Sequence, residues 1–430
     1  MRKALLKNKA SLSTIMDGGT SDYTDAIDWG GTSVDSGEIN GDGDMVIEYY
    51  FMPGTGLFGG FMPRMEWTDY EKQQVEIAFD TFEAIIDVEF VETANPDDAE
   101  FKLNKVNSFG LFLGVFNPPG TPGAGSGGFA GESDFWDAGD AFGNPTNGSL
   151  EQGGFGFITL IHEFGHGLGL AHPHDDGGGS TVLPGVSNSG DTGTGDLNQG
   201  VYTMMSYVDG WATHPDGPLN PGTTPDHGWV GTPMAVDVAL LQHKYGANDD
   251  YATGDDIYYL PGSNAAGTFY SCIWDAGGND TMAYVGSDNV VIDLRDATLQ
   301  LEEGGGGWIS YAEGIHGGYT IAHGVSIENA IGGDGNDALI GNEADNVLTG
   351  GLGADTFIFD SSGGGYDEIT DFTQGVDVID VSGMGRIRKR DVAVSHDGDG
   401  DVELQIFGTQ TINLTGLSFS DLSLSDFVLA

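Results

Sequence analysis

Apolar side chains recur every three or four residues in three stretches before Asn248, a spacing typical of helices. In the first stretch, Thr68 and Glu71 stand at the spacing of a capping box, so a helix is expected to begin there. The second stretch is apolar on most sides, which predicts a buried helix, and it ends where Gly169 allows a left-handed turn. The expected helices cover residues 68–86, 153–168 and 234–245.

Short apolar or alternating runs lie between these helices and predict β-strands over residues 45–51, 88–91 and 111–116. Helical periodicity then ends near Asn248, after which Gly, Asp and Asn alternate with single large apolar residues. A chain of 430 residues is also too long for one ordinary core. We therefore expect an N-terminal extension at 1–40, a mixed α/β domain at 41–248 and an all-β domain at 249–430.

A nine-residue repeat occurs in the second of these domains, with units that begin at Gly332, Gly341 and Gly350. Each unit contains a Gly-rich half-turn and then three residues with one large apolar side chain in the middle. This period predicts a parallel β-roll, in which the large side chains point inward. A disordered linker is not expected to keep an apolar residue at the same place in each unit. The inward-pointing residues are Leu339, Leu348 and Phe357.

Aspartates of this roll are expected to stack turn above turn and to repel one another until a cation lies between them. Calcium suits such a cage of carboxylate and backbone carbonyl oxygens, so the fold of the roll is predicted to depend on it. In the middle unit, Asn342, Ala344 and Asn346 replace Gly, Gly and Asp, so a calcium site there is expected to be weak or absent. The predicted ligands are Gly332, Asp334, Gly335, Asp337, Gly350, Gly353 and Asp355.

The formal net charge is −52, from 66 acidic and 14 basic residues, which argues against nucleic acid or an anionic membrane as a partner and favours divalent cations. Solubility in a salty medium is a second reading of the same charge. Cys272 is the only cysteine, which excludes an intramolecular disulfide and a thiolate zinc cluster. The sequence contains no apolar run long enough to span a membrane and no ordinary signal peptide. The protein is therefore expected either to stay in the cytoplasm or to be exported by a route that uses another signal in the chain.

The segment HEFGHGLGLAH, residues 162–172, has the spacing of a zinc site. His162 and His166 stand four residues apart, so both imidazoles project from one face of the predicted helix. Gly169 lets the chain turn back and bring His172 to the same ion. Glu163 is placed to accept the proton of a zinc-activated water that attacks a carbonyl. The pattern predicts a peptide hydrolase.

A second motif, TMMSYV at residues 203–208, fits the methionine turn that the metzincin zinc proteases place beneath the metal. Met205 is then the turn residue, and Tyr207 follows two places on. A plain core methionine is the other reading of Met205, and it is compatible with a role in packing under the histidines. His174 has no position in either motif and is predicted to be a solvated loop residue.

Several segments together make the chain from Met45 onward similar to the serralysins, bacterial calcium-dependent metzincin proteases with a C-terminal RTX β-roll. The resemblance implies an α+β metzincin-type protease domain followed by an all-β parallel β-roll and β-sandwich domain. It implies a secreted zinc endopeptidase with Glu163 as general base and Tyr207 as a mobile fifth zinc ligand beside His162, His166 and His172. The segments are TLIHEFGHGLGLAHP, MMSY, LLQHKYGAN, IWDAGGNDT and GVSIENAIGGDGND.

The same resemblance implies further sites and partners. Residues 111–116 resemble the edge strand to which a protein or peptide substrate adds as a β-strand. The ending SLSDFVLA resembles an uncleaved signal for the type I secretion apparatus, hence an extracellular protein, and a short propeptide is implied within the first 40 residues. A monomer is implied, and a proteinaceous inhibitor is a further candidate partner. The implied calcium ligands ahead of the repeats are Asp275, Gly277, Gly278, Asp280 and Glu328.

Two other classes of function stay open at this point. One is a calcium-dependent binding or adhesive RTX protein whose catalytic half has lost activity, and the intact zinc and catalytic residues favour the enzyme over it. The other is a different metzincin branch such as the astacins, which Pro173 after the third histidine and the β-roll disfavour.

Overall fold

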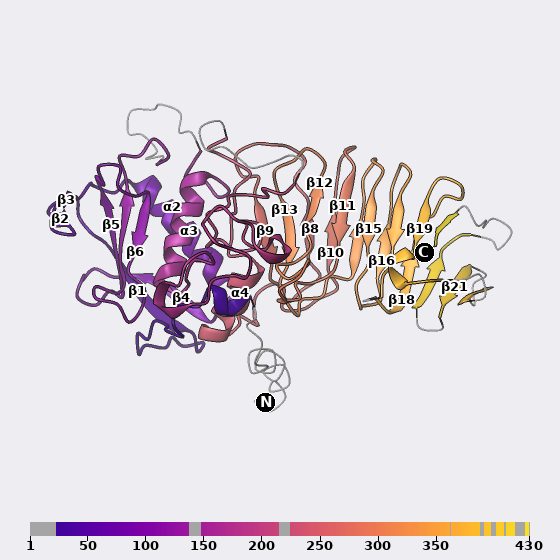
Figure 1. Cartoon of the computed structure of the whole chain (residues 1–430), viewed down its shortest axis with the longest axis horizontal. Coiled ribbons are helices and arrows are strands. Elements are labelled where there is room, and N and C mark those ends of the chain that lie inside the picture. Colours follow the sequence, from indigo (N-terminus) through magenta and orange to yellow (C-terminus); the bar gives the residue numbers. More distant parts are fainter. Residues whose placement is uncertain are drawn as a thin grey trace. The chain divides into compact units, whose positions relative to one another are not determined.

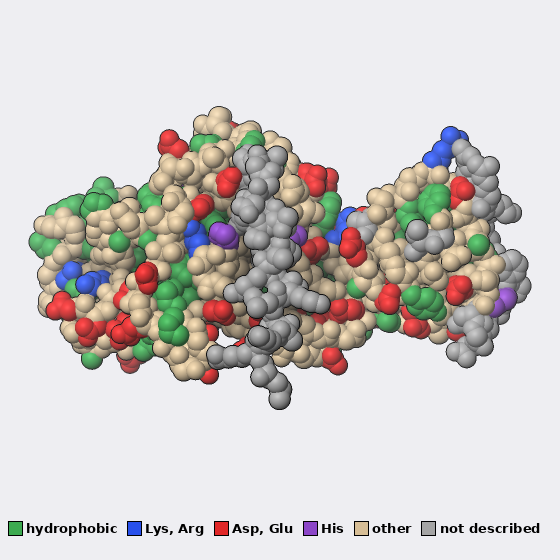
Figure 2. Space-filling view, turned by 90° about the horizontal axis from the view of Figure 1, so that it is seen from below, with side chains coloured by type: hydrophobic (Ala, Val, Ile, Leu, Met, Phe, Trp, Pro, Cys, Tyr) green, Lys and Arg blue, Asp and Glu red, His purple; other side chains and the backbone are tan. Residues whose placement is uncertain are grey.

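The computed structural model describes residues 23–136, 148–214, 224–361, 363–387, 391–396, 401–407, 410–417 and 426–429. It divides into two compact units. Unit 1 comprises Met1–Asn248 with Thr298–Gly306, and unit 2 comprises Asp249–Ala297 with Gly307–Ala430. Among the described residues, the structure has no helix that is both long and apolar enough to cross a membrane. Figure 2 shows acidic side chains spread over the visible face and basic ones in few places.

Unit 1 contains a five-stranded sheet in the order β4-β1-β5-β7-β6 (Figure 1). The first four strands in this order pair in parallel, and β6 pairs antiparallel with β7 and forms one edge of the sheet. A two-stranded hairpin of β2 and β3 lies outside this sheet. The strands are β1 (Met45–Phe51), β2 (Leu57–Phe58), β3 (Met62–Pro63), β4 (Val88–Glu92), β5 (Phe101–Val106), β6 (Gly114–Phe116) and β7 (Ser126–Ala130).

Three α-helices of unit 1 stand where the apolar spacing predicts them: α2 (Asp69–Glu83), α3 (Phe155–Gly167) and α4 (Ala235–Tyr245). The predicted capping box of α2 is present, with Thr68 Oγ1 accepting from the Glu71 amide and the Glu71 carboxylate accepting from the Thr68 amide. The Phe79 ring of α2 lies 4.2 Å from the Phe90 ring and 4.4 Å from the Phe164 ring. This aromatic core fixes α3 against α2 and the sheet.

The N-terminal segment from Tyr23 onward is part of the core of unit 1. Tyr23 and Ile27 are fully buried, and η1 (Thr24–Ala26) lies between them. The carbonyl of Ile27 accepts from the Ala171 amide at 2.7 Å, and the Trp29 amide donates to Gly169 at 3.0 Å. The region expected as an extension, residues 1–40, therefore includes a stretch that packs beside the end of α3. Residues 1–22 lie outside the described part of the chain.

The strand predicted over residues 111–116 is wrong in its first half, because only Gly114–Phe116 is a strand. Residues 108–112 instead form a turn around the side chain of Ser108. Its hydroxyl donates to Glu132 Oε1 at 2.7 Å and lies 3.1 Å from the Phe112 carbonyl, and the Gly110 amide donates to it at 3.2 Å. A buried serine that satisfies backbone groups locally competes with strand pairing.

Unit 2 contains two eight-stranded sheets, in the orders β20-β21-β22-β18-β16-β14-β10-β8 and β23-β19-β17-β15-β11-β12-β13-β9 (Figure 1). Strands of the repeat alternate between the sheets and pair in parallel, as a β-roll requires. The repeat strands are β14 (Asn329–Ile331), β15 (Ala338–Ile340), β16 (Val347–Thr349) and β17 (Thr356–Ile358). Their large central residues Leu339, Leu348 and Phe357 are fully buried, as predicted.

The other strands of unit 2 extend both sheets on each side of the repeat. They are β8 (Ile257–Tyr259), β9 (Tyr270–Ile273), β10 (Thr281–Ala283), β11 (Val290–Asp293), β12 (Ser310–Ala312), β13 (Gly318–Ile321), β18 (Gly365–Ile369), β19 (Val378–Asp380), β20 (Val392–His396), β21 (Val402–Ile406), β22 (Gln410–Leu414) and β23 (Phe427–Val428).

Candidate active site

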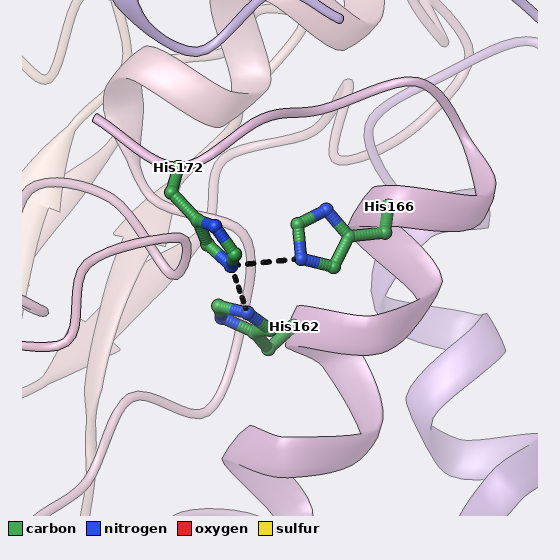
Figure 3. A group of neighbouring side chains, drawn as sticks. All are labelled: His162, His166 and His172. Atoms are coloured by element: carbon green, nitrogen blue, oxygen red, sulfur yellow. Dashed lines mark hydrogen bonds between the residues drawn. The ribbon is translucent and has the colours of Figure 1, made fainter. Parts of the chain in front are cut away.

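Three imidazoles converge on one point beside α3 (Figure 3). His162 and His166 stand one turn apart on the helix, and His172 returns to them after Gly169, whose φ of 94° ends the helix. The Nε2 atom of His172 lies 3.2 Å from Nε2 of His162 and 2.9 Å from Nε2 of His166. The three predicted ligands are thus brought together.

The opposite nitrogen of each ring faces an acceptor. Nδ1 of His162 lies 2.8 Å from the Met204 carbonyl, and Nδ1 of His166 lies 2.9 Å from the Leu170 carbonyl. Nδ1 of His172 lies 2.9 Å from Asp175 Oδ2. These acceptors place the ring proton on Nδ1, so three Nε2 lone pairs point to one position, which is the donor set that a zinc ion takes.

Burial keeps the rings of His162 and His166 neutral. It lowers the pKa of His166 to about 3, with the neighbouring imidazoles adding to the effect, and it lowers the pKa of His162 well below its ordinary value. Neutral imidazoles are the form that binds metal.

Glu163 lies buried next to this point, and its Oε2 atom is buried with no hydrogen-bond partner. Burial raises the pKa of Glu163 to about 8, with only the Phe116 backbone amide acting in the other direction. The edge strand β6 passes directly over the carboxyl group, since a Cβ atom on Gly114 would lie 2.5 Å from Glu163 Cγ. Only glycine fits at this crossing.

The methionine turn lies under α3. Met205 is fully buried, and a Cβ atom on Gly165 would lie 2.8 Å from its sulfur. The turn is held by the buried carboxylate of Asp237, which accepts from the Thr203 hydroxyl at 2.7 Å and from the Met204 amide at 2.7 Å. Since the Met204 carbonyl faces His162, Asp237 positions a ring of the site through this turn.

Tyr207 packs its ring against the imidazoles, with centroids 4.7 Å from His172 and 4.6 Å from His174. Burial and the charges of Glu163 and Asp175 raise its pKa to about 12, so its hydroxyl keeps its proton at neutral pH.

The prediction that His174 is a solvated loop residue is wrong. Its side chain is only 11% exposed, and its ring stacks on His172 at 4.8 Å with an interplanar angle of 16°. The cause is the turn that follows Pro173. Pro173 is buried, and its carbonyl accepts a hydrogen bond from the Leu183 amide. This turn folds His174 back against the third imidazole.

A small pocket lies between the residue before the edge strand β6 and the first turns of α3. Thr159 lies one helical turn before Glu163, and Leu113 directly precedes Gly114. The lining residues are Leu113, Ala130, Ser133, Phe135, Trp136, Gly156 and Thr159.

In unit 2, the predicted ligands Asp275 and Asp280 come together with Asp256, a residue that the sequence reasoning missed. Asp280 is fully buried, and its Oδ2 atom has no hydrogen-bond partner. Burial raises the pKa of Asp280 to about 6, and the negative charge of Asp275 acts in the same direction. Glu328 Oε2 accepts from the Asp280 amide at 2.8 Å. A buried, unpartnered carboxylate oxygen beside two other carboxylates fits a hard cation.

The predicted glycine ligands around this cluster lie in a tight turn. The Gly277 amide donates to Asp275 Oδ1 at 2.9 Å. A Cβ atom on Gly278 would lie 1.9 Å from the Gly254 carbonyl, so a side chain is excluded there. Asp256 could have been found from its position, because it precedes β8 directly, as Asp280 precedes β10.

The repeat aspartates form a ladder. Asp337 Oδ1 accepts from the Val290 amide at 2.9 Å, and Asp355 Oδ1 accepts from the Asp337 amide at 3.0 Å. Within the described ranges, the clusters of three metal-capable side chains do not include either aspartate. The other predicted repeat ligands lie in the half-turns beside this ladder: Gly332, Asp334, Gly335, Gly350 and Gly353.

In the middle unit, Asn346 closes its own turn. Its Oδ1 accepts from the Asn342 amide at 2.9 Å, and its Nδ2 donates to the Glu328 carbonyl at 3.1 Å and to Asn342 Oδ1 at 2.8 Å. The Asn346 side-chain amide thus donates to two oxygen atoms. A carboxylate at this position could not donate and would need a cation between it and those oxygens.

The known proteins that this chain resembles are serralysins and related metalloproteases. The family described as Peptidase M10 serralysin C terminal matches residues 243–429. The chain is 32% identical over 327 residues to "Serralysin" of Proteus mirabilis, which covers 70% of this chain and 60% of that protein. It is 32% identical over 386 residues to "Metalloprotease AprA" of Pseudomonas entomophila (strain L48), 81% of this chain and 74% of that protein. "Metallopeptidase AprA" of Pseudomonas marginalis is 29% identical over 429 residues, 91% of this chain and 85% of that protein.

Proposed function

Because the chain belongs to the serralysin family, we propose that it is a secreted, zinc-dependent endopeptidase that hydrolyses peptide bonds of proteins. The observation that carries this proposal is the convergence of three Nε2 atoms beside a buried, unpartnered carboxyl oxygen of Glu163. The zinc ligands are His162, His166 and His172. A zinc ion bound there supplies a Lewis acid that lowers the pKa of water toward neutrality.

Glu163 and Tyr207 have separate roles in the proposed reaction. Glu163 accepts a proton at Oε2 as water attacks the peptide carbonyl, and it passes that proton to the leaving amine. Burial of this carboxyl group favours its protonated form, which is the form that donates to the leaving amine. The Tyr207 hydroxyl, protonated at neutral pH, donates a hydrogen bond to the oxygen on which charge develops. Met205 supports the histidines from below.

The substrate adds to the free edge of β6 as an extended strand, with the scissile peptide next to Gly114 and Glu163. Main-chain bonds to β6 hold the peptide regardless of its sequence.

Calcium is the second cofactor in this proposal. Its sites are the Asp256, Asp275 and Asp280 cluster and the half-turns of the repeat. A roll that folds only when calcium fills these sites stays unfolded at low calcium inside the cell, passes through a type I secretion apparatus, and folds outside. The uncompensated buried charge of Asp280 supports this dependence.

The test is hydrolysis of casein by the full-length protein loaded with zinc and calcium. Glu163→Gln should lower kcat on the order of 10³-fold while the bound zinc, measured by metal analysis, stays at one ion in the catalytic unit. Glu76→Gln, which changes an exposed carboxyl on α2, is the matched control and should keep full activity. Undetectable turnover by the loaded wild-type protein would support the adhesive RTX alternative instead.

A further inference from the structure

An exposed apolar surface lies at one end of the edge strand β6. Phe109 is 62% exposed, Leu111 is 65% exposed and Leu113 is 37% exposed. We call these three residues the apolar ledge. Alternate residues of one short loop thus present three large apolar side chains to solvent, and clustered apolar side chains on a protein surface commonly mark a binding site.

The loop that carries the apolar ledge is fixed in place. Glu132 Oε1 accepts from the Ser108 hydroxyl at 2.7 Å and from the Gly110 amide at 3.3 Å, and Ser108 itself is fully buried. Phe109 has a φ of 56°, in the left-handed region that a phenylalanine rarely adopts. The exposure of its ring is therefore maintained by a defined and strained backbone, which is typical of functional surfaces.

The run of chain that carries the apolar ledge has no charged side chain. Between Lys105 and Glu132 the chain has no acidic or basic residue, although the whole chain has 66 acidic residues and a net charge of −52. A neutral apolar segment that binds along this run therefore meets no charged side chain of the run itself. Elsewhere on the chain the acidic charge would favour cationic partners.

The apolar ledge is continuous with the candidate active site. Leu113 lines the pocket beside α3, and the next residue, Gly114, lies against Glu163. The loop precedes β6 in the chain and so lies beyond only one end of that strand. A peptide that adds along β6 past Glu163 crosses the ledge on one side of the cleaved bond and not on the other.

We propose that the apolar ledge binds bulky apolar side chains of an extended substrate, about two to four residues from the cleaved bond and on one side of it only. The occupant is an extended, neutral polypeptide segment rather than an acidic or strongly basic one. This inference rests on the proposed function, and it adds the substrate class: unfolded or flexible protein segments rich in Leu, Phe and similar residues.

The experiment uses the full-length, zinc- and calcium-loaded protein and peptide pairs that differ by Leu or Ser at one position at a time. For wild type, the ratio of kcat/KM for Leu over Ser should be about 10 at one or two positions on a single side of the cleaved bond. The double variant Phe109→Ser with Leu111→Ser should bring that ratio close to 1 while kcat/KM for the Ser peptides changes less than about twofold. Ile39→Ser removes an equally exposed apolar side chain, 64% exposed, that lies beside Met45 at the start of β1, a strand that β5 and β7 separate from β6, and it should leave the ratio at its wild-type value.

A wild-type ratio that the double variant leaves unchanged, or equal preferences on both sides of the bond, would overturn the inference while hydrolysis of the Ser peptides keeps the proposed function intact. A loss of self-association in the double variant, seen by sedimentation without a change in the ratio, would assign the ledge to a second copy of the chain instead. If wild type cleaves none of the peptides, the proposed function fails first. Circular dichroism of each variant verifies that it is folded.

Discussion

Oδ2 of Asp175 lies 2.9 Å from Nδ1 of His172, so the third imidazole is oriented by a carboxylate only three residues further along the chain. Such a partner fixes the tautomer and raises the basicity of the ligand nitrogen. Asp175→Ala should therefore weaken zinc binding about 10- to 100-fold, measured by competition with a chromophoric chelator. The exposed neighbour provides the control, because Asp176→Ala should leave the affinity unchanged. Equal affinities for both variants would show that His172 needs no carboxylate.

Asp237 should carry much of the stability of the methionine turn. Asp237→Ala leaves the Thr203 hydroxyl and the amides of Met204 and Met234 without an acceptor inside the protein. We expect the free energy of unfolding of unit 1 to fall by about 3 kcal/mol in denaturant titrations, because unsatisfied buried donors are costly. Asp237→Asn keeps one acceptor oxygen and should lose less. If both variants were as stable as wild type, the turn would have to be held by other contacts.

Asn346 should act as a substitute for calcium in the middle repeat unit. Asn346→Asp places a carboxylate against the Glu328 carbonyl and Asn342 Oδ1, both of which now accept from its amide. Without calcium, the free energy of unfolding of unit 2 should fall by about 2 kcal/mol, and added calcium should recover the loss. Urea titrations with and without calcium measure both effects. Asn346→Ala is the comparison, since calcium should not recover its loss of stability.

The pH dependence of unit 2 should change sign with calcium. Burial and neighbouring carboxylates raise the pKa of Asp280 to about 6 from its ordinary value of 3.8. A raised carboxyl pKa means that the metal-free folded state holds its proton more tightly than the unfolded chain, so stability falls as pH rises through this interval. Asp355, with a pKa of about 6, acts in the same direction.

We therefore expect metal-free protein to melt at a higher temperature near pH 5 than near pH 7.5, and calcium to stabilise it most at the higher pH. Thermal unfolding followed by circular dichroism at both pH values measures this difference. Asp280→Asn should reduce it. A metal-free protein that is more stable near pH 7.5 would contradict the assignment of these carboxylates to a cation site.

Much of the architecture could be predicted because it depends on local spacing. The period of α2 and its capping residues Thr68 and Glu71 are read within a few turns of chain. The nine-residue period likewise specifies alternating parallel strands with Leu339 and Phe357 inside. The three histidines follow from one helix and one glycine turn. In each case the partners are near in sequence, so a pattern is enough.

The residues that the sequence did not reveal act through contacts between distant segments or through local turns without a motif. Asp237 reaches Met204 across 33 positions, and Asp256 meets Asp280 across 24. Neither stands at a recognisable spacing from the residue that it supports. The Ser108 hydroxyl binds the Phe112 carbonyl and holds residues 108–112 in a turn. Apolar periodicity alone does not predict such a turn. His174 has no position in a motif, and its place depends on packing against His172.

The position of Tyr23–Ile27 has a consequence for the order in which the molecule assembles. Backbone hydrogen bonds join Ile27 to Ala171 and Trp29 to Gly169, immediately before His172, the third proposed zinc ligand. The backbone before His172 is therefore held in place only after two segments that are far apart in the sequence have met. Such distant loop closure is slow. Proteolytic removal of this early segment would loosen His172 even though every metal-binding side chain remained. A nascent chain released from the ribosome thus gains its zinc affinity late, when the segment from Tyr23 to Trp29 docks.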